Sequence, residues 1–148
     1  KDDIFMAQWE NNQYQNPISV SDAINTNGYE FNAFVAPDES FLIYTCYNRT
    51  DGFGSGDLYI SYKNENAEWS TAKNLGTEIN SAQMDYCPFV NLKTKKLYFT
   101  SKRSKVKKSF EKNLNTNTFL EEVNQYENGV SRIYVVDFSN FVKPSPKN

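Results

Sequence analysis

Residues 57–61 read DLYIS, and residues 3–7, which lie 54 positions earlier, read DIFMA. Both stretches begin with Asp and continue with the aliphatic and aromatic side chains that are typical of β-strands. Three further pairs of segments match at a shift of 55 residues: 23–26 (AINT) with 78–81 (EINS), 29–35 (YEFNAFV) with 84–90 (MDYCPFV), and 42–46 (LIYTC) with 97–101 (LYFTS). Matches at four places in nearly one register indicate an internal repeat.

One full repeat unit spans residues 31–85 and predicts a four-stranded antiparallel sheet. Residues 37–40 (PDES) supply a turn in which Pro presets φ and Asp caps the backbone. The loop 51–56 (DGFGSG) contains three glycines, which permit positive φ. The expected strands lie at 32–36, 41–47, 57–63 and 69–75.

The rest of the chain is assigned by the same repeat. Residues 1–30 supply the last two strands of a preceding unit, near 3–8 and 14–19. Residues 86–143 form the last unit, with strands near 87–91, 96–101 and 132–137, and residues 144–148 are expected to be a poorly ordered tail. The last unit carries an insertion, residues 104–130, for which Thr118 and Glu121 predict a capping box at the start of a short helix that stops near 128–129.

The composition supports an all-β chain and excludes two classes of partner. Aromatic residues make up 16% of the chain although its mean hydropathy is −0.71, which fits aromatic strands joined by very polar loops. The net charge is −2, from 16 basic and 18 acidic residues, so no overall field favours nucleic acid. No apolar run approaches the roughly 20 residues that a membrane-spanning helix needs.

The chain contains no histidine, which removes the usual general base and the commonest metal ligand. Nucleophile pairs that depend on His are therefore excluded within this chain. Two cysteines, Cys46 and Cys87, are too few for an all-thiolate zinc site, and neither a metal nor a cofactor is expected. The two cysteines are interpreted as small strand-side hydrophobes, with a disulfide between them as the lesser alternative.

The loop after residue 48 is the best candidate for ligand binding. Arg49 can clamp an anion, while Asp51 and Asp57 offer hard oxygens to a cation. Arg103 closes the equivalent segment of the next unit and is a candidate for the same reason. The recurrence of Asp57 as Asp3 favours a structural role for this carboxylate, in which it bonds to neighbouring amides.

Two carboxylates, Glu30 and Asp85, occupy equivalent positions just before the first strands of their units. Paired carboxylates can carry out glycoside hydrolysis. Equivalence within a repeat more often reflects a structural requirement at the start of each unit, so the catalytic interpretation is kept as the alternative.

The complete unit resembles the Pro-Asp-type β-propeller repeat of TolB-like proteins of the bacterial cell envelope. The resemblance rests on residues 34–38 (FVAPD), 56–61 (GDLYIS), 74–76 (NLG), 85–90 (DYCPFV) and 133–137 (IYVVD). The last unit departs from the pattern, because residues 91–95 lack the Pro-Asp pair and Ser131-Arg132 replaces the Gly-Asp before its third strand. The resemblance is specific for the fold and weak for function, since propellers host many activities.

The resemblance implies propeller blades, of which the chain supplies about two and a half, fewer than the four to eight that close a ring. The remaining blades are expected from a longer parent chain or from another copy. The implied function is a non-catalytic binding or scaffold module, periplasmic or associated with the cell envelope, that recognises a protein or a cell-wall component. The alternative is a part of a propeller hydrolase, a glycosidase or peptidase-associated domain, that uses Glu30 and Asp85.

Overall fold

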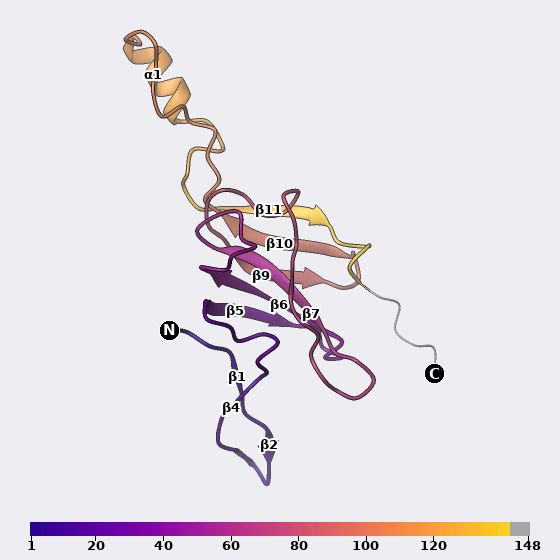
Figure 1. The fold of residues 1–148 in the computed structure, drawn as a ribbon. Helices are drawn as coiled ribbons and strands as arrows, with labels where there is room; N and C mark the ends of the chain where they lie inside the picture. The colour runs from indigo at the N-terminus through magenta and orange to yellow at the C-terminus, as the bar shows by residue number, and fades with distance from the viewer. Residues whose placement is uncertain (143–148) are drawn as a thin grey trace.

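The computed structural model describes residues 1–142, which form small antiparallel sheets and one helix. Two larger sheets are stacked in the middle of the molecule, an N-terminal arm (residues 1–20) extends below them in Figure 1, and the helix lies far from both. The elements are β1 (Phe5–Met6), β2 (Trp9–Glu10), β3 (Gln13–Tyr14), β4 (Ile18–Ser19), β5 (Tyr29–Val35), β6 (Phe41–Tyr47), β7 (Asp57–Tyr62), β8 (Lys73–Asn74), β9 (Asp85–Asn91), β10 (Lys96–Ser101), α1 (Thr116–Val123) and β11 (Arg132–Asp137).

The central sheet has the strand order β5-β6-β7-β8, as expected for one complete repeat unit. Strand β6 is buried from Phe41 to Cys46, so both of its faces are covered. The turn before it forms as the sequence predicts: Asp38 accepts hydrogen bonds from the backbone N–H and the hydroxyl of Ser40, and these bonds lower the pKa of the Asp38 carboxyl. The four-stranded antiparallel prediction is confirmed, although the described residues do not close into a ring.

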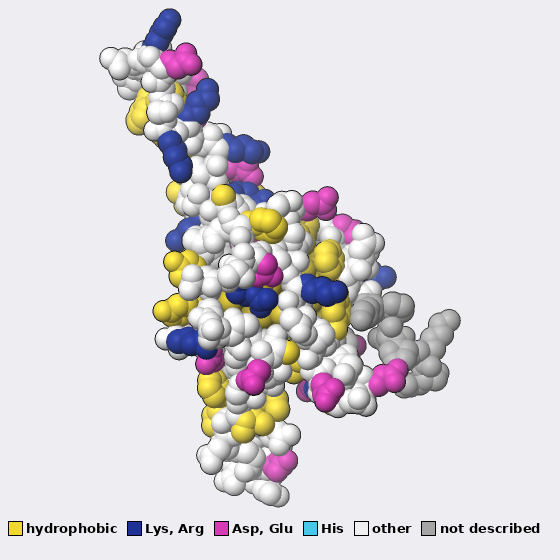
Figure 2. All heavy atoms as spheres, viewed as in Figure 1, with side chains coloured by type: hydrophobic (Ala, Val, Ile, Leu, Met, Phe, Trp, Pro, Cys, Tyr) yellow, Lys and Arg dark blue, Asp and Glu magenta, His cyan; other side chains and the backbone are white. Residues whose placement is uncertain are grey.

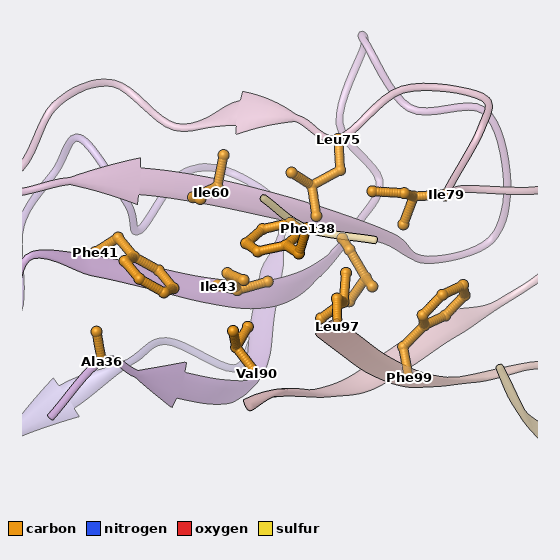
Figure 3. Close-up of a cluster of buried hydrophobic side chains, with 11 residues drawn as sticks. Ala36, Phe41, Ile43, Ile60, Leu75, Ile79, Val90, Leu97, Phe99 and Phe138 are labelled. Carbon is orange, nitrogen blue, oxygen red and sulfur yellow. The ribbon is translucent and has the colours of Figure 1, made fainter. Parts of the chain in front are cut away.

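The last sheet, in the order β11-β10-β9, stacks on one face of the central sheet. Alternate residues of facing strands meet there, including Ile43 and Ile60 from the central sheet and Val90 and Leu97 from the last one. Figure 3 shows these side chains directed toward one another around the ring of Phe138, which is fully buried. This cluster is the main hydrophobic core.

The opposite face of the central sheet forms a second core. Leu42, Tyr44 and Tyr59 lie on this face and are at most 2% exposed. They are covered by Ile24, which is fully buried, and by the partly buried Ile4 of the arm. The central sheet is therefore enclosed between the last sheet and the segment that precedes it.

The repeat is visible in matching contacts between units. Asn25 clamps Ile4 through both main-chain groups: its Oδ1 accepts from Ile4 N and its Nδ2 donates to Ile4 O, each at 2.8 Å. Asn80 clamps Leu58 in the same way, at 2.8 and 3.0 Å. Each asparagine clamps the residue directly after the repeated Asp, which lies 21 or 22 positions earlier in the chain. The sequence match between residues 3–7 and 57–61 thus reflects a contact that is made twice within the chain.

Strands β5 and β9 begin at Tyr29 and Asp85, before the predicted starts at 32 and 87. Each contains a bulge in its pairing, and the residue at the bulge, Asn32 or Cys87, has a left-handed φ of 51° or 52°. A bulge breaks the alternation of inward and outward side chains, which hides the first part of the strand from a period-two pattern. The predictions for the ends of β6, β10 and β11 are confirmed.

The outermost strands are shorter than predicted. Only Lys73–Asn74 of the expected strand 69–75 forms β8, with Trp69 adding a single bridge to Lys63. In the arm, β1 and β4 each have two residues, and an unpredicted hairpin, β2 and β3, lies between them. The predicted tail, residues 144–148, lies outside the described residues.

The insertion, residues 104–130, contains α1 as predicted, but the predicted cap is wrong. The N-cap is Asn115, whose side chain accepts from Thr118 N at 2.9 Å. Thr118 is therefore inside the first turn. Asn is as good an N-cap as Thr. With Asn115 as the cap, the Thr118 backbone N–H, which is free in the first turn, finds an acceptor. The predicted stop near 128–129 is also wrong, because the helix ends at Val123 with Asn124 as its C-cap. Within residues 1–142 no helix is both long and apolar enough to cross a membrane.

The bulge at Cys87 gives a stability prediction. Replacing Cys87 with asparagine is expected to raise the free energy of unfolding by about 1 kcal/mol, because Asn tolerates the left-handed conformation better than other non-glycine residues. Cys87 is exposed, so little packing is lost. Urea unfolding measures the change, and Asn32→Cys at the equivalent bulge should produce a loss of similar size. A loss from both changes would contradict the assigned backbone conformation.

Candidate functional site

The two repeated carboxylates sit at equivalent corners where the chain enters β5 and β9. Glu30 Oε1 accepts from the backbone N–H and hydroxyl of Thr26, at 3.1 and 2.5 Å. Asp85 Oδ2 accepts from the same two groups of Ser81, at 2.6 and 2.8 Å. Glu30 is 1% exposed and Asp85 is fully buried. Each carboxylate therefore holds a tight turn four residues before it, which explains its recurrence in the repeat.

The corner at Asp85 is closed by Arg103. The Arg103 Nη2 donates to Asp85 Oδ1 at 3.1 Å and to Ile79 O at 2.6 Å, and its Nε donates to Ser101 Oγ at 2.9 Å. Its guanidinium also lies 4.4 Å from the centre of the Tyr134 ring. Arg103, predicted to bind a ligand, is thus held by the protein on several sides.

The corner at Glu30 has the same parts in a different arrangement. Arg49 lies 4.4 Å above the Tyr59 ring, as Arg103 does above Tyr134, but its Nε pairs with Asp51 Oδ1 at 3.1 Å. The Nη1 of Arg49 and the Oε2 of Glu30 are both buried, and neither has a hydrogen bond to the described residues. Two buried polar groups thus remain without protein partners in the first corner, one on an arginine and one on a carboxylate.

Arg49 and Asp51 line a shallow polar hollow of about 500 Å³ between two loops. The loop 26–28 forms one wall and the loop 48–51 forms the other. The lining residues are Thr26, Asn27, Gly28, Asn48, Arg49, Thr50 and Asp51. Hydroxyl, amide, guanidinium and carboxylate groups can together both donate and accept hydrogen bonds, as recognition of a polar ligand requires.

Gly28 makes the hollow possible by letting its two walls approach closely. A Cβ at this position would lie 2.6 Å from Tyr47 O and 2.8 Å from Cys46 Sγ. The backbone oxygen cannot yield without moving β6, so only glycine fits there. The sequence reasoning missed Thr26, Asn27 and Gly28 as site residues, although their place next to repeated Glu30 was a signal that could have indicated them.

Asp57 is fixed beneath the glycine-rich loop rather than presented to solvent. It is 1% exposed, and its Oδ2 accepts from Phe53 N at 2.5 Å and from Asn74 Nδ2 at 2.8 Å. A Cβ on Gly54 would lie within 2.5 Å of backbone oxygens at Ser81 and Gln83. The glycines therefore allow this loop to pack on the next corner, and the structural interpretation of Asp57 fits the observed contacts.

The predicted site residues thus separate into two groups. Arg49 and Asp51 meet at the hollow with Glu30 behind Thr26, while Arg103 and Asp85 meet at the equivalent corner of the last sheet. Asp51 also accepts a hydrogen bond from Tyr59 at 3.0 Å. Within residues 1–142 no cluster of three or more carboxylate or thiol side chains is arranged to hold a metal ion.

The two cysteines are both free, and they differ in their surroundings. Cys87 is exposed, whereas Cys46 is buried and its Sγ donates to Glu30 Oε1 at 3.2 Å. Burial, with the adjacent Glu30 carboxylate, raises the pKa of the Cys46 thiol to about 12.

This difference predicts two separate rates of thiol labelling. With a maleimide or aromatic disulfide reagent at pH 8, Cys87 should react at once, whereas Cys46 should react at least about 100-fold more slowly. The reason is that Cys46 is both inaccessible and protonated. Mass spectrometry of the peptides measures the two rates, and Cys87→Ser isolates the slow one. Equal rates would show that Cys46 is open to solvent.

No family model, no curated protein and no solved structure matches the chain.

Proposed function

We propose that the protein is a non-catalytic binding or scaffold module of the β-propeller type. The stacked antiparallel sheets, the internal repeat and the matching Asn25 and Asn80 clamps support this proposal. In such an architecture each sheet is a blade, the chain contributes about two and a half blades, and further blades complete the ring. The chain would be periplasmic or attached to the cell envelope, as its resemblance to TolB-like repeats suggests.

The observation that carries a binding role is the contrast between the two corners. At the closed corner Arg103 and both oxygens of Asp85 bond to the protein, whereas at the first corner Arg49 pairs within its own loop and the exposed side chains of Asn27, Asn48 and Thr50 line an open polar hollow. The amide, hydroxyl and carboxylate groups that line the hollow can bond directly to a polar ligand, and each such bond contributes about 0.5–1.5 kcal/mol. The ligand is a protein or a cell-wall component that offers both acceptors and donors.

The hydrolase alternative has no observation in its favour. A general acid or base must reach its substrate, but Glu30 and Asp85 are almost completely buried and are bonded to their own turns. In an enzyme, Glu30→Gln or Asp85→Asn would abolish turnover and leave stability intact. In a scaffold, the same changes lower stability and affect no turnover.

Site-specific photo-cross-linking tests the binding role. A benzophenone amino acid is placed at Asn27, which is exposed in the hollow, and at Glu65, an exposed turn position far along the chain. After irradiation with a bacterial envelope fraction, we expect a defined adduct from position 27 and none from position 65. Adding Arg49→Gln should reduce the adduct at least about fivefold, since a charge-assisted hydrogen bond is lost.

The matched control is Lys112→Gln, which removes one positive charge from the distant insertion and should leave the adduct unchanged. Equal labelling at positions 27 and 65, or no effect of Arg49→Gln, would refute the hollow as the binding site. Mass spectrometry of the adduct distinguishes a protein partner from a wall fragment.

A further inference from the structure

The central sheet shows what each face of a repeat unit requires. The face that carries Ile43, Leu58 and Ile60 is covered by the last sheet, and these side chains are at most 3% exposed. The other face is covered by the segment that precedes the sheet. Both faces of this unit are apolar, and neither is left open.

The last sheet carries the equivalent of the first face, but it is uncovered. In the repeat, Tyr98 corresponds to Ile43, Ile133 to Leu58 and Val135 to Ile60. Tyr98 is paired with Phe89 on one side and with Val135 on the other, so these three side chains form a row across the sheet. Val135 and Ile133 are 51% and 70% exposed, whereas Tyr98 is partly buried and Phe89, at the edge of the row, is 54% exposed and contacts the ring of Phe34. A face that is buried in one unit is therefore open in the next.

The N-terminal arm carries an open surface of the complementary kind. Strand β1 corresponds to β7, and Ile4 packs on the central sheet as a side chain of the covered face does. Phe5 corresponds to Tyr59 and is 57% exposed, with the edge-to-face pair of Trp9 and Tyr14 further along the arm. Figure 2 shows hydrophobic side chains gathered on this arm below the body of the molecule.

We propose that two copies of this chain associate head to tail, with the open face of the last sheet of one copy covered by the N-terminal arm of the other. The last sheet presents the face that corresponds to Ile43 and Ile60, and the arm presents the opposite face, which corresponds to Tyr59. The contact between copies therefore repeats the contact between the central and last sheets. Stacking of this kind buries apolar side chains that are otherwise exposed to water. The inference rests on the propeller-type stacking proposed above, but it does not depend on the hollow at Arg49.

A head-to-tail contact uses two different surfaces, in contrast to the single self-complementary surface of a two-fold dimer. Such contacts form a closed ring when the rotation per copy divides a full turn, and otherwise they form an open chain. Two or three copies give about five to seven and a half blades, which lies within the range of closed propellers. The proposed assembly is therefore a ring of two or three copies.

Light scattering and sedimentation velocity over a range of concentrations test the proposal. The unmodified chain should have the mass of two or three copies. Ile133→Lys on the last sheet and Phe5→Lys on the arm should each weaken association at least tenfold, because a lysine buried there loses its hydration. Val130→Lys changes an equally exposed apolar residue in the insertion and should have no effect.

Mixing the two variants separates a head-to-tail contact from every other arrangement. Each variant keeps one intact surface, so an equal mixture should form a one-to-one pair that cannot grow further. A two-fold dimer that uses one of the two surfaces twice would instead persist in the variant that keeps this surface. It would be lost in the other variant. Circular dichroism melts confirm that each variant is folded.

Three results would overturn the proposal: an unmodified chain that is monomeric at the highest soluble concentration, an equal effect of Val130→Lys, or a mixture that stays monomeric. A monomer would mean that a different sheet covers this face. Arg49→Gln should leave the mass unchanged, so failure of self-association and failure of the binding site give different results.

Discussion

Replacing Asp85 with alanine is expected to lower the free energy of unfolding by about 3–5 kcal/mol. Asp85 is fully buried, accepts two hydrogen bonds from Ser81 and pairs with Arg103 at 3.1 Å. Its removal leaves an arginine that is mostly covered without its counter-charge and frees the turn before β9. Urea unfolding monitored by tryptophan fluorescence and by circular dichroism measures the loss.

Glu30→Ala is the matched control for this prediction. Glu30 holds the equivalent turn through Thr26 but forms no ion pair with Arg49. We therefore expect a smaller loss, of about 1–3 kcal/mol, from the hydrogen bonds alone. In the Asp85→Ala background, Arg103→Ala should cost less than it does in the unmodified chain, because the ion pair is already absent and only the bonds to Ile79 O and Ser101 Oγ and the ring contact remain to be lost. Equal losses at positions 30 and 85 would show that the Asp85–Arg103 pair does not stabilise the fold.

Replacing Asn80 with alanine is expected to cost about 2–4 kcal/mol. The side chain of Asn80 accepts from the N–H and donates to the C=O of Leu58, which is buried near the start of β7. It also donates to Asn74 Oδ1 at 2.8 Å. Alanine leaves the buried Leu58 N–H without a partner and removes the link between β7 and the following segment.

Hydrogen exchange gives a local measurement of the same change. The Leu58 amide should exchange faster in the Asn80→Ala variant, while the Ile4 amide, which is clamped by Asn25, should keep its protection. Asn25→Ala should reverse the pattern with a loss of about 1 kcal/mol, because the Ile4 contact is only partly buried. Slow exchange of Leu58 in the Asn80→Ala variant would mean that the clamp is not needed to order β7.

The candidate site could be anticipated only in part. The repeat indicated Glu30, Asp85, Arg49 and Arg103 as equivalent residues, and their turns and ring contacts are indeed equivalent. It did not indicate that one corner is closed and the other open. That difference depends on where Arg49 finds its partner: it pairs with Asp51 in its own loop, whereas Arg103 reaches back to Asp85.

The local and periodic features of this protein follow from its amino-acid sequence. The repeat, the all-β character, the four strands of the central unit and the exact span of β6, β10 and β11 follow from strand propensity, turn residues and self-similarity, which act over short distances. Tertiary packing sets the bulges at Asn32 and Cys87, the close approach at Gly28, the partners of Arg49 and the uncovered face of the last sheet. Each of these depends on which segments, distant in the chain, come to lie against one another, and the same residue types are compatible with either outcome until the sheets are packed.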